Sequence, residues 1–418
     1  MTKILCAAIA LALVATPSFA DEPDGLVLPP GFHATVVAEG VGPARHMAVR
    51  GNGDIYISTR RGNDEKSNGI IALRLGPDHR AVRIEPFSDV SGGTGIRFDR
   101  GALYASSPTA IYRFAFAGSE LAPSAPPQLV IDGMPTGGFA NRPLAFDGNG
   151  NLFVSVGGSG NLCTDQNAPK GSKPVGLKPC PSLTGRSGIW RFRAAARDQR
   201  FPGDGEQLST GVRDIDALAF SPGRNALYAV AHDRNGTHQS WPDVVSAADE
   251  AAIAEEMHRI VKGTDLGWPY TYYDSTRKIR LVAPEYGGDG KTEAPSGRYS
   301  TPLFAFPAHG APLDMVFYDG KQFPAKYRGG AFVAFHGGLG PHLAAGRPGY
   351  NIMFVPIDRK GTVGTPEVFA DGFAGAAPDA RNVDSAKYRP VGVAVAPDGA
   401  LYIADSKKGR IWRISYGG

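Results

Sequence analysis

The feature that most constrains this chain is a short pattern that recurs along its whole length. Each copy has alternating small apolar residues, a turn usually built on Gly with Asp or Asn, and a second alternating run with an aromatic residue. The copies are HMAVRGNGDIYISTR (46–60), GIRFDRGALYASS (95–107), PLAFDGNGNLFVSVG (143–157), ALAFSPGRNALYAVA (217–231), MVFYDGKQFPAKYRGGAFVAFHG (315–337) and GVAVAPDGALYIADS (392–406). Alternation around such turn residues predicts a β-hairpin at each position.

A third strand of another type follows several of these hairpins. The segments are IYRFAF (111–116), GIWRFRA (188–194), MHRIV (257–261), NIMFVPI (351–357) and GRIWRISY (409–416). Repeated units of this kind predict an all-β fold, a six-bladed β-propeller with loop insertions. We expect the early strand GFHATVVAEG (31–40) to complete the last blade and close the ring. An ordinary β-sandwich with coincidental turns is the alternative.

Helical patterns are scarce in this sequence. Residues 246–259 are the one good candidate, because acidic residues come early and His258 and Arg259 come late. The chain has 55 Gly and 34 Pro, dispersed along it, which suits short strands joined by tight turns. No linker divides the chain, so we expect one propeller domain over residues 21–418.

Residues 1–20 have the pattern of a cleavable signal peptide. Lys3 supplies a positive start, an apolar run extends from Ile4 to Val14, and Ser18-Phe19-Ala20 forms a small-x-small cleavage site. We therefore expect a mature protein that begins at Asp21, is periplasmic or secreted, and does not span the membrane.

Two cysteines remain after Cys6 leaves with the signal peptide. Cys163 and Cys180 lie in one long segment between two repeats. Exported proteins rarely keep free thiols, which favours a disulfide between the two. Two unrelated free thiols are the alternative.

Charge and motifs exclude several classes of function. The formal net charge is +4, and no run of Lys or Arg indicates nucleic-acid binding. There is no C-x-x-C-H for covalent haem and no G-x-G-x-x-G that follows a strand and opens a helix. The stretch Gly157–Gly160 is typical of a loop rather than of the turn that carries a hydrolase nucleophile.

Charged and imidazole side chains recur where the predicted strands begin or end. Those before an inner strand are His46, Arg142, Arg213, Asp214, Lys387 and Arg389, and His336 ends a second strand. Residues that enter the same strand of several blades converge on one mouth of a propeller. A group of cations there would hold a multiply anionic ligand. The alternative for each residue is a solvated charge at a strand end or, for the histidines, a structural role.

Taken in order, these segments resemble the soluble dehydrogenases of the glucose/sorbosone dehydrogenase family, which depend on pyrroloquinoline quinone (PQQ). The similar stretches are LPPGFHATVVAEGVGPARHMAVRGNGDIYIS, GGSGNLC with the later PC and SGIWRF, the segment from GVRD to GWPYTYYD, APLDMVFYDG to GGAFVAFHG, and YRPVGVAVAPDGALYIADSKKGRIWRI. The resemblance covers nearly all of the mature chain. It implies a six-bladed propeller with the quinone and a calcium ion over its central channel.

The resemblance also assigns roles to particular residues. Arg213 matches an arginine near the quinone, and Asp214 stands where asparagine is usual. Lys387 and Arg389 match a basic pair that holds the carboxylates of the cofactor. Asp233 and Arg234 match a loop whose backbone carbonyls bind calcium, an ion that prefers oxygen ligands.

Two positions depart from the pattern of that family. Phe139 stands where the family has the histidine that acts as general base, and phenylalanine cannot accept a proton. Gly337–Gly340 replaces the usual polar run after His336. His46 is the first candidate for a substitute base, followed by His336 and Asp214.

The function expected from these residues is calcium- and PQQ-dependent oxidation of a sugar or sugar-like alcohol or aldehyde, with an external electron acceptor. In that chemistry Arg213 would stabilise charge on the quinone oxygen. The first alternative is a propeller that lost dehydrogenase chemistry and binds a carbohydrate or another ligand. The second is a lactonase-like hydrolase, which would need a metal cage of Asp, Asn and Glu side chains that the sequence does not reveal.

Overall fold

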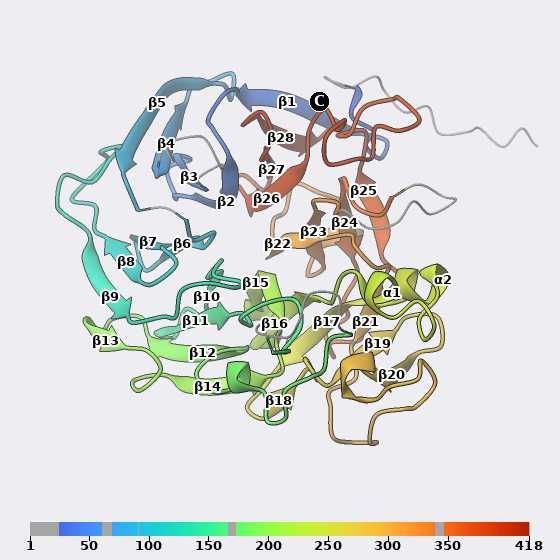
Figure 1. Cartoon of the computed structure of the whole chain (residues 1–418). Helices are drawn as coiled ribbons and strands as arrows, with labels where there is room; N and C mark the ends of the chain where they lie inside the picture. Colours follow the sequence, from blue (N-terminus) through green and yellow to red (C-terminus); the bar gives the residue numbers. More distant parts are fainter. Residues whose placement is uncertain (1–24, 61–68, 91, 166–172, 339–346, 418) are drawn as a thin grey trace, which may run out of the picture.

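A computed structural model describes residues 25–60, 69–90, 92–165, 173–338 and 347–417. Six β-sheets stand around a central axis as the blades of a propeller (Figure 1). The four main strands of each blade are antiparallel, and the short edge strands of two blades pair parallel. The predicted fold class is confirmed. The signal-peptide prediction falls outside the described residues. No helix in the described ranges is long and apolar enough to cross a membrane.

Each blade runs outward from an inner strand that faces the central axis. The first blade has β2 (Ala44–Val49), β3 (Ile55–Thr59), β4 (Ile70–Leu75) and β5 (Ala81–Ser88), and the second has β6 (Ile96–Asp99), β7 (Ala102–Ser106), β8 (Ile111–Phe114) and β9 (Gln128–Asp132), with β13 (Gln199–Arg200) at the edge. The third has β10 (Leu144–Phe146), β11 (Asn151–Val156), β12 (Gly188–Arg193) and β14 (Glu206–Thr210), with β18 (Thr264–Asp265) at the edge, and the fourth has β15 (Asp214–Ser221), β16 (Ala226–His232), β17 (Glu255–Ile260) and β21 (Phe304–Phe306). The fifth has β22 (Pro312–Phe317), β23 (Ala331–Phe335), β24 (Asn351–Val355) and β25 (Glu367–Ala370), and the sixth has β26 (Pro390–Val395), β27 (Leu401–Asp405), β28 (Ile411–Tyr416) and β1 (Phe32–Ala38).

The ring is closed by the first strand of the chain, as expected from the sequence. β1 pairs antiparallel with β28, so that Phe32 lies opposite Tyr416. The two ends of the chain therefore contribute to one blade (Figure 1). All six predicted hairpins form the first two strands of a blade, and the predicted third strands are β8, β12, β17, β24 and β28.

The apolar core is divided among the interfaces between neighbouring blades. One interface is represented by Tyr228 of β16 and Phe317 of β22, whose ring centroids are 5.2 Å apart. Another packs Phe32 against Phe323 and Phe369. Burial of such rings explains why each hairpin repeats an aromatic residue, since a blade buries its faces only against its neighbours.

The helix predicted over residues 246–259 is wrong beyond its first turns. Ser246 caps α2 (Ala247–Ala251) through a capping box with Asp249, but the chain then leaves the helix. Residues from Glu255 onward form β17, which pairs with β16 and β21 and buries Met257. Pairing within the blade outweighs the charge pattern that favoured a longer helix.

The remaining elements belong to two insertions, one between β16 and β17 and one between β18 and β21, and to short turns. They are α1 (Thr237–Ser240), the hairpin β19 (Thr271–Asp274) and β20 (Ile279–Val282), and the 3₁₀ turns Pro181–Leu183, Pro222–Arg224, Pro284–Tyr286 and Ala325–Tyr327. The helices α1 and α2, which lie between β16 and β17 in the sequence, are beside the end of the fourth blade (Figure 1). A disulfide joins Cys163 to Cys180, which confirms the predicted pairing.

Four of the inner strands carry a β-bulge near their start. The register of β2, β15, β22 and β26 shifts there, and the extra residues include His46, Asp216, Leu313 and Val391. A bulge turns a side chain away from its normal direction in the sheet. These four residues line the interior of the channel.

Candidate active site

A cavity of about 780 Å³ opens at one end of the channel. It lies where inner strands begin, second strands end and third strands begin, which is the same end of every antiparallel blade. Among the residues proposed from sequence, Arg213, Asp233, His336 and Arg389 line it. Other titratable residues in its wall are His232, His238, Glu250, Glu255, His309 and Arg347.

Arg213 is the buried cation at the base of this cavity. It directly precedes β15, and its Nε donates a 3.1 Å hydrogen bond to Asn161 Oδ1. Its guanidinium lies over the ring of Phe139, 4.4 Å from the centroid. Burial lowers the pKa of Arg213, but the nearby carboxyls of Asp214 and Asp233 oppose that shift and favour the charged form.

Arg389 is another cation of the wall and comes from the start of the sixth blade. Its Nε donates to the carbonyl oxygen of His336 at 3.3 Å, and its Nη2 donates to the carbonyl of Gly337. Lys387 does not line the cavity, and its Nζ lies 5.2 Å from the centroid of the Tyr388 ring. The structure therefore brings together Arg213 and Arg389, but not Lys387, at the cavity surface.

His336 lies between the cavity and the deeper channel. Its Nε2 is 2.7 Å from Ser406 Oγ, and it lines both the main cavity and a smaller one of about 190 Å³. Burial, together with Arg389 and Arg45, lowers the pKa of His336 well below its usual value. The imidazole is therefore neutral near pH 7 and able to accept or donate a hydrogen bond.

His46 occupies the smaller cavity and not the main one. Its Nε2 is 2.6 Å from the carbonyl oxygen of Leu313, which requires a proton on that nitrogen. Burial lowers the pKa of His46 to about 4. A substrate in the main cavity is thus not in contact with His46, the first substitute base considered from sequence.

Hydrogen bonds at both backbone groups of Phe139, its N–H and its carbonyl, fix the position of the residue. Its N–H donates to the carbonyl of Gly158 at 3.0 Å, and its own carbonyl accepts from Arg142 Nη1 at 3.1 Å. A Cβ atom at Gly157 would come within 2.6 Å of the Phe139 Cβ, so Phe139 is closely packed against that glycine. The half-buried ring contributes a platform for Arg213 rather than a proton acceptor.

The loop expected to bind calcium follows β16. Asp233 lines the cavity, and burial raises its pKa to about 6. The side chain of Arg234 is committed elsewhere, with Nη1 at 2.9 and 2.8 Å from the two carboxylate oxygens of Glu285. Any contribution of Arg234 to a metal therefore comes from its backbone carbonyl. The carboxylate of Asp233, with the backbone carbonyls of this loop, offers the oxygen ligands that calcium prefers.

Sequence reasoning missed Glu255 as a site residue. It is the first residue of β17, is 5% exposed, and lines the cavity. Its Oε1 accepts the N–H of Ala311 at 3.3 Å, while its Oε2 is buried without a hydrogen-bond partner among the described residues. Burial raises the pKa of Glu255 to about 8. The prediction of a helix over this segment concealed that Glu255 sits at a strand start.

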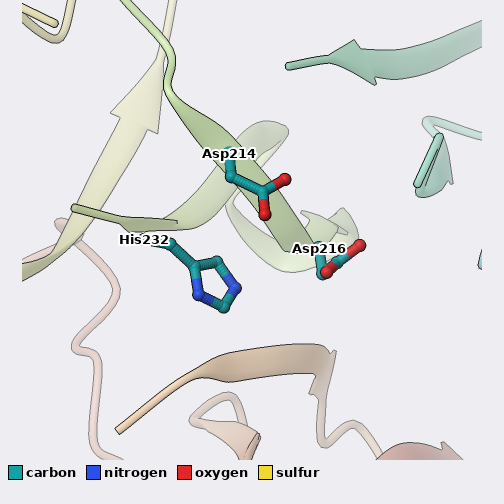
Figure 2. Close-up of side chains that lie close together, drawn as sticks. All are labelled: Asp214, Asp216 and His232. Carbon is teal, nitrogen blue, oxygen red and sulfur yellow. The ribbon is translucent and has the colours of Figure 1, made fainter. Parts of the chain in front are cut away.

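Asp214 belongs to a group of potential metal ligands that the sequence did not assemble. Asp214 and Asp216 of β15 and His232 of β16 each offer one ligand atom, and these atoms lie within 4.8 Å of one another. Figure 2 shows the two carboxylates on one strand and the imidazole beside them. His232 lines the main cavity, and Asp216 lines the deeper one.

Comparison with known proteins identifies proteins of similar sequence and fold. An uncharacterized protein of Borreliella burgdorferi is 28% identical over 214 residues, 50% of this chain and 49% of that protein. This chain thus spans about half the length of that curated relative. Among solved structures, an enzyme of carbohydrate-active family AA12 from Trichoderma reesei has a TM-score of 0.75 at 16% identity, covering 94% of this chain and 97% of that one.

Two further structures share the fold at similar identity. The holo PQQ domain of a pyranose dehydrogenase from Coprinopsis cinerea has a TM-score of 0.71 at 15% identity, covering 96% of this chain and 98% of the other. The apo form of a soluble aldose sugar dehydrogenase from Escherichia coli has a TM-score of 0.60 at 17% identity, covering 92% and 99%. The family model described as TrAA12-like matches residues 26–417. The chain therefore belongs to the TrAA12-like family.

Proposed function

We propose that this protein is a PQQ- and calcium-dependent dehydrogenase that oxidises a sugar or a sugar-like alcohol or aldehyde. The observation that carries the proposal is the cavity of about 780 Å³ whose wall holds Arg213 from the fourth blade and Arg389 from the sixth. PQQ carries several carboxylates, and guanidinium groups bind such groups with paired hydrogen bonds. The fold shared with a PQQ domain and a sugar dehydrogenase supports the same proposal.

The chain's own residues fit the binding of such a cofactor. Arg389 is aimed by the carbonyls of His336 and Gly337, and Arg213 is held between Asn161 and the Phe139 ring. Both guanidinium groups are thus preorganised, so little side-chain freedom is lost when an anion binds.

The other residues proposed from sequence would act around these two arginines. Asp233 and the backbone of Arg234 would hold calcium beside the cofactor. His336 is proposed to contact the polar edge of the cofactor, and Lys387 would add positive charge from outside the cavity wall. Asp214, which does not line the main cavity, would act on the cofactor only through its neighbour Arg213.

When bound, the quinone would supply the two-electron acceptor for carbinol oxidation. Arg213 would stabilise negative charge at the cavity base. The hydroxyl proton needs an acceptor on the cavity wall, and Phe139 is not one. Glu255 Oε2, which is buried and lacks a hydrogen-bond partner among the described residues, is better placed in that wall than His46. Because the pKa of Glu255 is about 8, it would accept the proton in its ionised form, whose share grows as the pH rises toward that value. His336 is an imidazole proposed from sequence that also reaches this wall.

The test is reconstitution of the mature protein with PQQ and calcium, followed by absorbance and dye reduction with a panel of sugars. Arg389→Met should weaken quinone binding at least tenfold, because a charge pair in a buried site is removed. Arg83→Met is the control, since Arg83 lies on β5 and its side chain is 59% exposed. Absence of quinone binding by the wild-type protein would eliminate the proposal.

A second candidate function is a propeller that binds a carbohydrate or another ligand without oxidising it. Phe139 is the observation that favours it, because the ring provides an apolar platform against Arg213 and cannot accept a proton. Stoichiometric ligand binding without turnover, in protein shown to hold quinone, would establish this second function over the first.

Export to the periplasm or outside the cell is part of the proposal. The disulfide between Cys163 and Cys180 supports an oxidising compartment. Mass spectrometry of the mature protein from its native host should find an N-terminus at Asp21. Retention of residues 1–20 in the mature protein would contradict export by cleavage.

A further inference from the structure

The group formed by Asp214, Asp216 and His232 is built into the fourth blade. Asp214 lies directly opposite His232 in the ladder between β15 and β16. Asp216 is the extra residue of the bulge in β15, which turns it into the channel. Figure 2 shows the three side chains close together on two neighbouring strands. The pairing of β15 with β16 therefore fixes the backbone positions from which the three side chains extend.

The carboxylates of this group are held by neutral hydrogen-bond donors. Asp214 and Asp216 share the amide of Asn141, whose Nδ2 lies 3.3 Å from Asp214 Oδ1 and 3.0 Å from Asp216 Oδ2. The hydroxyl of Thr94 adds a 3.3 Å contact to Asp216 Oδ1. Two buried carboxyl groups this close disfavour each other's ionised form, and a cation between them would remove that repulsion.

Two arginines influence Asp216 from a distance. Arg45 and Arg60 line the same deeper cavity and favour its charged form. Burial and the charge of Asp214 outweigh them and raise the pKa of Asp216. The hydrogen bonds of Asn141 and Thr94 supply no positive charge, so a cation held directly between the two carboxylates would add the charge that these donors lack.

His232 completes the group with a nitrogen that has no hydrogen-bond partner in the part of the chain that the structure describes. Its Nε2 is buried and neither accepts nor donates a hydrogen bond within the described residues. Its Nδ1 lies 3.7 Å from Glu255 Oε2, and the backbone of Pro312 offers a further acceptor. A proton on Nδ1 leaves the lone pair of Nε2 available, which is the arrangement common to metal-binding histidines. Burial lowers the pKa of His232, so the imidazole is neutral.

We propose that Asp214, Asp216 and His232 bind one divalent transition-metal ion, of the class of Zn²⁺, Co²⁺ or Mn²⁺. Mixed oxygen and nitrogen ligands suit these ions, whereas calcium takes six to eight oxygen ligands. Ligands about 2.1 Å from one ion are at most about 4.2 Å apart. The spread of up to 4.8 Å therefore closes with small side-chain rotations.

This site is distinct from the calcium proposed at the loop of Asp233 and Arg234. It uses side chains on the channel side of the blade rather than carbonyls of the loop. It does not depend on the proposed function, because all three ligands come from the protein chain. Its predicted effect is to tie β15 to β16 beneath the floor of the main cavity.

The experiment uses the mature protein, freed of metal with a chelator and kept without quinone. Titration with Co²⁺ should give visible absorption bands that saturate at one equivalent, and Zn²⁺ should displace them. The thermal midpoint should rise with Zn²⁺ concentration, since an ion that binds only the folded state stabilises it. Calcium at the same concentrations should not displace Co²⁺.

Matched variants identify the ligands. His232→Gln and Asp216→Asn, which nearly preserve side-chain size, should each weaken Co²⁺ binding at least tenfold. His258→Gln is the control, because His258 is also a buried histidine beside a carboxylate, 3.0 Å from Glu256, but lies outside the group.

Three results would overturn the proposal. They are no saturable binding by the wild type, unchanged binding by both His232→Gln and Asp216→Asn, or displacement of Co²⁺ by calcium. Loss of dehydrogenase activity in a protein that still binds Co²⁺ would bear on the proposed function alone.

Discussion

The Arg213 guanidinium stacks on the Phe139 ring, with 4.4 Å between its carbon and the ring centroid. Position 139 is where the sequence predicts the general base of a quinone-dependent sugar dehydrogenase, and a phenyl ring offers a cation a surface but no proton acceptor. Arg213 lines the cavity while Phe139 does not. Phe139 therefore affects the cavity indirectly, through its contact with Arg213.

Replacing Phe139 by leucine tests the stacking. Phe139→Leu keeps an apolar side chain but removes the ring face, which is worth about 0.5–2 kcal/mol to a stacked cation. We expect quinone binding to weaken about 2- to 30-fold, measured by titration of the reconstituted protein. Phe220→Leu is the control, because Phe220 stacks on Phe153 and not on an arginine at the cavity. Equal affinities for the two variants would show that the ring does not position Arg213.

Replacing Phe139 by histidine tests the missing base. In Phe139→His the imidazole would lie beside Arg213, and that charge would keep its pKa low and the ring able to accept a proton. If the proposed function holds, sugar oxidation by the reconstituted variant should rise about 10²–10⁴-fold. Stopped-flow dye reduction measures the change. No increase, in a variant that binds quinone as the wild type does, would show that a side chain at position 139 does not reach the substrate hydroxyl or that a different group already takes the proton.

The six-bladed fold could be predicted from the sequence because the signals of its hairpins are local. Each hairpin shows its turn and its alternation within one short segment, and the early strand over 31–40 needed only a partner at the other end of the chain. The segment after Ser246 is the counterexample. Its local charges favour a helix, but β16 and β21 supply strand partners on both sides of β17, which the local pattern cannot reveal.

The place of a residue relative to a predicted inner strand showed which arginines line the main cavity. It did not show which residues lie in the deeper channel. Arg213 and Arg389 directly precede inner strands, and both line the cavity. His46 and Asp216 each lie within a bulge of an inner strand and are turned into the deeper channel. A bulge leaves no clear mark in an apolar alternation, so the pairing of Asp216 with His232 and the depth of His46 could not be predicted from sequence.

His46 should make the protein sensitive to mild acid. Burial lowers its pKa from 6.5 to about 4, so below pH 6.5 the unfolded chain gains a proton that the folded chain does not. Its contribution to stability is present above pH 6.5 and is lost as the pH falls toward 4, at about 1.4 kcal/mol per pH unit. Urea unfolding of wild type and His46→Gln at pH 7 and pH 5 measures this. The variant should lose less stability between the two pH values, and parallel losses would contradict the assignment.

Glu255 should make the free energy of unfolding fall as the pH rises, which is the opposite of the effect of His46. Burial raises its pKa from 4.5 to about 8, so between these values the unfolded chain releases a proton that the folded chain keeps. Its contribution to stability is therefore full below pH 4.5 and falls as the pH rises toward 8, by about 1.4 kcal/mol per pH unit. Glu255→Gln keeps the acceptor for the Ala311 N–H but has no proton to lose. Relative to wild type, it should gain stability between pH 5 and pH 7.5 in urea unfolding, and a constant difference across that range would refute the raised pKa.

The disulfide between Cys163 and Cys180 should stabilise the segment that carries a hydrogen-bond partner of Arg213. The two cysteines are 17 residues apart, and closing a loop of that length is worth about 3 kcal/mol. Asn161, whose Oδ1 accepts from Arg213, lies two residues before Cys163. The double variant Cys163→Ser, Cys180→Ser should therefore lose about 3 kcal/mol of unfolding free energy and also bind quinone more weakly. Treatment of the wild type with a reductant should reproduce both changes. A loss of stability with unchanged quinone affinity would show that the link closes the loop without positioning Asn161.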